Sequence, residues 1–140
     1  MKLQNKVVII TGGAGGIGAG MGRAMAKEGA IIVAVDVNPE TGAKIAGELQ
    51  QISPKSMFVQ ADLIDHANLK NIVEDVVTKY GHLDVLVNNA HASKQVPFLE
   101  TTPENLALSM DTGFYPTWYL MQAAIPHLKE TKGNIINFAS

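Results

Sequence analysis

Glycines dominate a short segment near the start of the chain, between Thr11 and Gly20. Backbone amides without neighbouring side chains are suited to binding phosphate. An apolar run precedes this segment, and a helical pattern follows it from Gly16. Because a helix carries a positive dipole at its N-terminus, its first amides attract an anion. This spacing therefore predicts a diphosphate bound at a turn between a strand and a helix.

A carboxylate follows the turn at the distance that a bound dinucleotide requires. Asp36 ends the next apolar run and lies about 20 residues beyond the turn, where dinucleotide-binding folds place an acid that accepts hydrogen bonds from a ribose hydroxyl. A 2′-phosphate there would meet like charge, and neither the turn nor Val37 and Asn38 supplies a cation to offset it. The acid therefore favours NAD over NADP.

Two glycine registers fit the turn, one general and one more restrictive. The alternatives to a dinucleotide site are a turn that binds no ligand and a methyltransferase-like loop that binds S-adenosylmethionine. The absence of G-K-[ST] argues against a nucleotide-hydrolysing P-loop. The general pattern G-x-G-x-x-G is satisfied by Gly13, Gly15 and Gly18, and the restrictive pattern T-G-x-x-x-G-x-G by Thr11, Gly12, Gly16 and Gly18.

The other reactive residues show no spacing that indicates a site. His66, His82, His91 and His127 form neither H-x-x-x-H nor H-E-x-x-H, so we expect no metal site. The sequence has no G-x-S-x-G elbow for a nucleophilic serine. It also has no cysteine, which excludes thiolate chemistry and is compatible with a reducing, cytoplasmic location.

Short apolar runs alternate with amphipathic stretches, which predicts successive strand–helix units and a parallel sheet covered on both faces. We therefore expect a Rossmann-like, doubly wound α/β fold of three layers, incomplete, with about five strands. The expected strands are 7–10, 31–35, 57–59, 83–87 and 135–138.

The helices are expected to begin and end at recognisable signals. The first should span 16–28 and bury one face made of Ile17, Met21, Ala24 and Met25. Asp65 is expected to cap a long helix that ends near residue 81. Other helices are expected after Asn38, after residue 102, and from about residue 113 to 128.

The bulk composition fits one folded domain over residues 1–140. The chain is 46% hydrophobic and has a net charge of −2 without a basic block, which argues against nucleic acid and anionic lipid as partners. No stretch approaches the roughly 18 apolar residues of a membrane span, so we expect no membrane association.

In these features the chain resembles the short-chain dehydrogenase/reductase family along its whole length. Besides the T-G-x-x-x-G-x-G turn, that family has an Asp after the third strand, N-N-A-G after the fourth and G-x-I-[IV]-N-x-x-S at the fifth. The sequence matches these motifs in order with Asp62, 88–90 and 133–140.

The resemblance implies a set of residues that bind NAD. Asp62 and the Leu63 backbone would contact the adenine, although a turn or capping role for Asp62 is the alternative. The N-N-A segment would line the cofactor at the carboxyl edge of the sheet. The implied cofactor-binding residues are Thr11, Gly12, Gly15, Gly16, Ile17, Gly18, Asp36, Val37, Ala61, Asp62, Leu63, Asn88, Asn89 and Ala90.

Ser140 matches the family's catalytic serine, which hydrogen-bonds the substrate oxygen while a tyrosine transfers the proton and a lysine lowers that tyrosine's pKa. An ordinary serine at a strand end is the alternative. In the family the tyrosine and lysine form Y-x-x-x-K, and no tyrosine of this chain is followed by lysine at that spacing. We therefore expect the N-terminal portion of a family member, inactive alone.

Two positions depart from the family pattern. His91 stands where the family has glycine after N-N-A, and we expect it either to line the nicotinamide pocket or to have no role in the reaction. Gly113 falls at the position of the family's helix asparagine, which takes part in a proton relay.

The leading hypothesis is an NAD(H)-dependent oxidoreductase that interconverts a small-molecule secondary alcohol and a ketone by hydride transfer. The alternative is a non-catalytic module that binds or senses NAD. The resemblance implies a homo-oligomer, a tetramer or dimer, in which helices within 102–128 form one interface.

Overall fold

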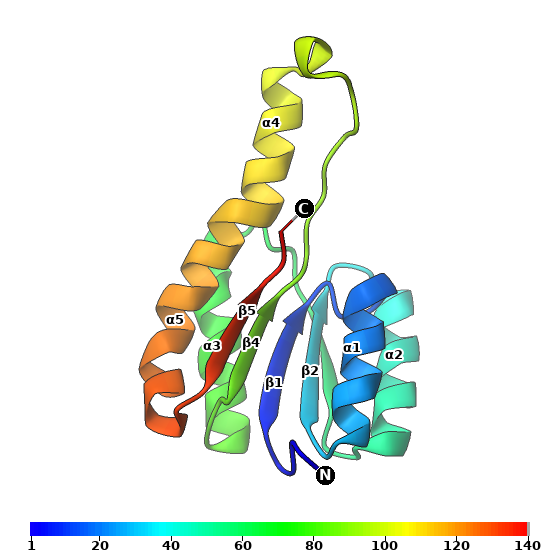
Figure 1. Cartoon of the computed structure of the whole chain (residues 1–140), viewed down its shortest axis with the longest axis vertical. Coiled ribbons are helices and arrows are strands. Elements are labelled where there is room, and N and C mark those ends of the chain that lie inside the picture. Colours follow the sequence, from blue (N-terminus) through cyan, green and yellow to red (C-terminus); the bar gives the residue numbers. More distant parts are fainter. Residues whose placement is uncertain (140) are drawn as a thin grey trace.

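The computed structural model describes residues 1–139, and within them a parallel sheet with five strands carries the other elements (Figure 1). Its strands lie in the order β3-β2-β1-β4-β5, and each neighbouring pair runs parallel. The chain winds outward from β1 to β3 and then crosses back to β4, so the winding direction changes between β1 and β4. The strands are β1 (Val7–Thr11), β2 (Ile31–Asp36), β3 (Met57–Gln60), β4 (Val85–Asn88) and β5 (Asn134–Asn137).

Two pairs of helices cover the sheet. α1 (Gly16–Lys27) and α2 (Pro39–Ile52) lie on one face, and α3 (Leu69–Tyr80) and α5 (Tyr115–Thr131) lie on the other (Figure 1). Each face has its own apolar core, because alternate residues of the strands point to opposite sides. In β1, for example, Ile9 packs in the cluster with α3 and α5, while Ile10 packs in the cluster with α1 and α2. The predicted doubly wound α/β architecture is confirmed.

The buried face of α1 differs from the prediction. Ile17 is 66% exposed, Ala24 is exposed, and Met21 and Met25 are only partly buried. Small side chains let the helix axis lie closer to the sheet than branched ones would, so the large residues flank the contact. The residues of α1 that are buried are Gly18, Ala19, Gly22 and Ala26.

The starts of the next two helices follow different rules. The side chain of Asn38 accepts hydrogen bonds from the Glu40 and Thr41 amides and caps α2, as expected. The prediction that Asp65 caps the long third helix was wrong, because its side chain makes no capping bond and a 3₁₀ turn, His66–Asn68, precedes α3. The Asp62 carboxylate instead accepts the Ile64 amide, in the segment just before this 3₁₀ turn.

A nearly continuous helix, 103–131, lies between β4 and β5 in the sequence; we call it the rod. α4 (Pro103–Ser109) begins at a capping box formed by Thr102 and Asn105. It passes through a π-helical segment, Met110–Phe114, directly into α5, and α4 extends beyond the sheet (Figure 1). A separate helix start near residue 113 was predicted, but the backbone stays helical with a wider turn there. Segments of this kind are frequent at functional sites.

Candidate functional site

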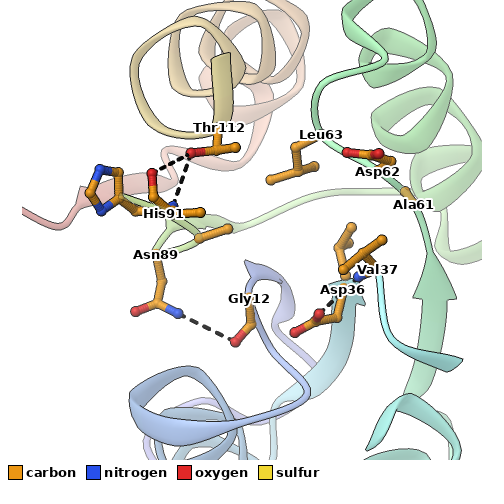
Figure 2. Close-up of a pocket in the computed structure, with 12 residues that line it drawn as sticks. Gly12, Asp36, Val37, Ala61, Asp62, Leu63, Asn89, His91 and Thr112 are labelled. Atoms are coloured by element: carbon orange, nitrogen blue, oxygen red, sulfur yellow. Dashed lines mark hydrogen bonds between the residues drawn. The ribbon is translucent and has the colours of Figure 1, made fainter. Parts of the chain in front are cut away.

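A cavity of about 320 Å³ lies where the carboxyl ends of β1, β2, β3 and β4 meet (Figure 2). Parallel strands bring their carboxyl ends to one edge, and ligands of open α/β sheets bind there. The structure thus brings together residues that lie far apart in the sequence. The cavity is lined by Gly12, Val35, Asp36, Val37, Ala61, Asp62, Leu63, Asn89, Ala90, His91, Ala92 and Thr112.

The glycine turn leads into a helix start that no side chain caps. Gly15 is the N-cap of α1, and the first turn of this helix contains no acidic residue. The first amides of a helix have no partner within it, and here no side chain supplies one. A Cβ placed on Gly15 or Gly16 would meet no atom within 4 Å, so the turn is open to solvent at these two residues. The segment is therefore suited to an anion.

Asp36 faces the cavity with its carboxylate held by backbone donors. One oxygen accepts the Ala14 amide at 3.1 Å, and the other accepts the Val37 amide at 2.8 Å. Figure 2 shows this carboxylate beside Gly12, on the side of the cavity formed by β2. These bonds connect the acid to the glycine turn and fix its position, while each oxygen keeps further acceptor capacity for a ligand hydroxyl.

The segment after β3 forms the opposite wall. The Ala61 amide donates to the carbonyl oxygen of Asp36 at 2.9 Å, which continues the sheet spacing past the end of β3. Asp62 uses one carboxylate oxygen for the Ile64 amide at 3.1 Å. Asp62 thus has the turn role that was the alternative interpretation, and it also lines the cavity with Leu63.

Thr11 does not line the cavity; it is buried beside it and holds two of the surrounding segments together. It is 2% exposed, and its hydroxyl oxygen accepts the amides of Asn89 and Ala90, each at 3.0 Å. The Asn89 side chain donates in return to the carbonyl oxygens of Thr11 and Gly12, at 3.1 and 3.4 Å. These contacts couple the glycine turn to the loop after β4.

A second cavity of about 540 Å³ adjoins the first across that loop, at the ends of β4 and β5. Asn88 lines it, and its side-chain nitrogen donates to the side-chain oxygen of Asn137 at 2.9 Å. The Asn88 side-chain oxygen is buried and has no hydrogen-bond partner within residues 1–139. The second cavity is lined by Ile17, Asn88, Asn89, Ala90, His91, Ser109, Gly113, Phe114, Thr117, Phe138 and Ala139.

The predicted catalytic Ser140 follows Ala139 directly and lies outside the described residues. Sequence reasoning missed the contribution of the rod to both cavities. Thr112, Phe114 and Thr117 come from the π-helical segment and the start of α5, and no motif identifies them. The one available signal was their position beside Gly113.

Within residues 1–139, no helix is both long and apolar enough to cross a bilayer. The same residues contain no group of three or more His, Cys, Asp or Glu side chains arranged to hold a metal ion.

Comparison with known proteins identifies relatives along the whole chain. The sequence is 34% identical over 141 residues to the L-fucose dehydrogenase of Mus musculus, which covers 99% of this chain and 50% of that protein. It is 38% identical over 145 residues to the 12alpha-hydroxysteroid dehydrogenase of a Clostridium species, covering 98% of this chain and 56% of that protein. The chain therefore spans about half the length of these relatives.

A solved structure agrees with the sequence comparison. The crystal structure of Cj0485 dehydrogenase superposes with a TM-score of 0.91 at 31% identity, covering 99% of this chain and 53% of the other. The sequence model of the short chain dehydrogenases matches residues 6–140. The chain belongs to the short-chain dehydrogenase family.

Proposed function

We propose that this chain binds NAD(H) and supplies the cofactor-binding part of an oxidoreductase that interconverts a secondary alcohol and a ketone. The observation that carries the proposal is the fixed carboxylate of Asp36 beside an uncapped helix start. The carboxylate can accept hydrogen bonds from a hydroxyl, and the helix start can bind an anion, at the same edge of the sheet. Such a pair fits a nucleotide that has both a ribose and a diphosphate.

In this proposal each of the two cavities binds one half of the dinucleotide. The first cavity takes the adenosine half, with the ribose at Asp36 and the adenine between Val37 and the segment 61–63. The diphosphate lies at the amides that begin α1. The nicotinamide half passes over β4 into the second cavity. From the sequence motif alone, we propose that Ser140 orients the substrate oxygen.

NAD, when bound, supplies the hydride chemistry. The names of the relatives support an alcohol as the substrate class, since they are dehydrogenases of L-fucose, of a 12alpha-hydroxysteroid and, in Serratia marcescens at 35% identity, of meso-2,3-butanediol.

NAD is favoured over NADP because Asp36 would repel a 2′-phosphate. We expect the chain to bind NADH more tightly than NADPH in a fluorescence titration. Asp36→Ala should weaken NADH binding by roughly 10- to 150-fold, the effect of losing about 1.5–3 kcal/mol from a hydrogen bond to a charged group. It should also reduce the preference over NADPH, since the like charge is removed.

Two controls make this titration decisive. Asp65→Ala removes an exposed acid of a nearby loop that does not line the cavity, and it should leave NADH affinity unchanged. Asp36→Asn keeps a hydrogen-bond acceptor but removes the charge, so it separates the two effects. Equal affinity for NADH and NADPH in the unsubstituted chain, or tighter binding of S-adenosylmethionine, would contradict the proposal.

A non-catalytic NAD-binding module is the second candidate, because the 140 residues contain no Y-x-x-x-K motif. Both candidates predict NADH binding, so turnover separates them. We expect the 140-residue chain to bind NADH and, when supplied with NAD⁺, not to oxidise a panel of secondary alcohols. Addition of a segment that carries Y-x-x-x-K should restore turnover only if the chain is part of an enzyme.

A further inference from the structure

The imidazole of His91 lies in a space that exists because residue 113 is glycine. A Cβ placed on Gly113 would be 2.8 Å from the Cδ2 atom of His91 and 3.7 Å from its Nε2 atom. A distance of 2.8 Å is closer than carbon atoms pack, so any side chain at position 113 would displace the ring. His91 and Gly113 therefore form a matched pair across the site.

Hydrogen bonds between the neighbouring residues Ala92 and Thr112 hold the two segments of this pair together. The Ala92 amide donates to the hydroxyl of Thr112 at 2.9 Å, and that hydroxyl lies 3.0 Å from the Ala92 carbonyl oxygen and 2.7 Å from that of Leu108. Thr112 and Gly113 belong to the π-helical segment, whose wider turn presents them to the loop after β4. The side chain of Thr112 thus holds the loop that carries His91 next to Gly113.

The ring is also placed to meet a ligand. His91 lines both cavities, and within residues 1–139 neither of its ring nitrogens has a hydrogen-bond partner. Figure 2 shows its imidazole on the far side of the loop from Asp36 and Asp62. By contrast, His66 is engaged with the carbonyl oxygen of Asp111 at 3.1 Å and stacks on Tyr119.

We propose that His91 is a positioning residue that hydrogen-bonds the ribose of the nicotinamide half of the dinucleotide, and that Gly113 keeps its ring in place. The inference rests on the proposed function. If Asp36 holds the adenosine ribose and the start of α1 holds the diphosphate, the second ribose crosses from one cavity to the other beside His91. An imidazole can both donate to and accept from ribose hydroxyls.

Comparing the binding of three nucleotides isolates the contact of His91 with the second ribose. NADH and ADP-ribose contain the second ribose, whereas ADP does not. We expect His91→Ala to weaken NADH and ADP-ribose binding by about three- to tenfold, the effect of losing one hydrogen bond. Binding of ADP should stay unchanged. Ser93→Ala, two residues along the same exposed loop and outside both cavities, is the matched control and should change none of the affinities.

A double-mutant cycle tests the role of Gly113. Gly113→Ala should displace the ring and weaken NADH binding about as much as His91→Ala, and the double variant should be no weaker than His91→Ala alone. His91→Gln, which keeps a donor and an acceptor, should recover part of the affinity. The NMR signals of the His91 ring should shift with NADH and ADP-ribose but not with ADP, which a purely structural role would not produce.

The outcomes separate the inference from the function on which it rests. If the unsubstituted chain binds none of the three nucleotides, the proposed function and the inference both fail. If it binds all three and His91→Ala changes no affinity, or weakens ADP as much as NADH, the inference alone is overturned. Additive losses for His91→Ala and Gly113→Ala would overturn the role of Gly113.

Discussion

Tyr80 ends α3 at the edge of the sheet opposite to the candidate site. Its hydroxyl donates a hydrogen bond to the carbonyl oxygen of Lys55 at 2.6 Å. Burial raises the pKa of this phenol above its ordinary value of 10.0, because the charged form loses hydration. The folded state therefore holds the proton more tightly than the unfolded state does.

This difference predicts a pH-dependent stability. The contribution of protonated Tyr80 is fully present below pH 10 and is lost as the pH rises through the raised pKa of the folded state. In urea unfolding, the free energy of the unsubstituted chain should fall more steeply above pH 10 than that of Tyr80→Phe. Tyr119→Phe controls for the loss of a tyrosine hydroxyl elsewhere, and parallel curves for all three proteins would contradict the prediction.

The sequence predicts single residues of the candidate site where one chemical demand determines the residue type. Asp36 was predicted to face a ligand from its distance to the glycine turn, and it lines the cavity. The cofactor contact expected of Thr11 stays a prediction, and the structure shows that its hydroxyl accepts the amides of Asn89 and Ala90. The position of the His91 ring next to Gly113 could not be predicted, since it depends on a contact between segments about twenty residues apart.

At the scale of elements, the close approach of α1 to the glycine turn determines which substitutions are tolerated. A Cβ on Gly18 would collide with the carbonyl oxygen of Gly12 and lie 2.8 Å from the side-chain nitrogen of Asn89. A Cβ on Gly20, in the same helix, would meet no atom within 4 Å. We therefore expect opposite effects on stability when these two glycines are replaced.

Gly18→Ala should destabilise the fold by about 1–3 kcal/mol, because the turn must move to admit the methyl group. Gly20→Ala should stabilise it by roughly 0.5–1 kcal/mol, since alanine loses less conformational freedom in a helix. Chemical unfolding of both variants beside the unsubstituted chain measures the difference. Equal effects of the two substitutions would show that helix propensity, and not the contact with Gly12, governs this segment.

The elements themselves were largely predictable, because their periodicity reports burial. Each predicted strand exists, although β4 begins at Val85 and not at residue 83. The buried face of α1 was assigned wrongly, since large apolar residues mark a core face only where the helix does not need to lie close to the sheet. The π-helical segment was not predictable either, because no sequence motif marks it, and it contacts the loop after β4 through Thr112.

At the scale of the whole molecule, large apolar side chains are exposed at several places, and two of these surfaces lie on regular elements beside the edge of the sheet. The first is the outer face of α5, where Tyr115, Trp118 and Ile125 are 41%, 48% and 40% exposed. The second is β5, which has one neighbouring strand and exposes Ile136 to 42%. Exposed apolar patches of this kind mark sites of association, so either surface is a candidate contact between two copies of the chain.

The α5 face is the stronger candidate, and we expect the chain to form homo-oligomers through it. Its aromatic residues recur at helical spacing and pack on one another, with the Trp118 and Tyr119 rings 5.0 Å apart. β5 is a short edge of four residues that begins and ends with asparagine, and short polar edges are poor templates for strand pairing. In size-exclusion chromatography with light scattering, Trp118→Glu should reduce the mass to that of a monomer, while Ile136→Lys should leave the oligomer intact. The reverse result would place the contact at the sheet edge, because a lysine there blocks strand addition without touching the aromatic face.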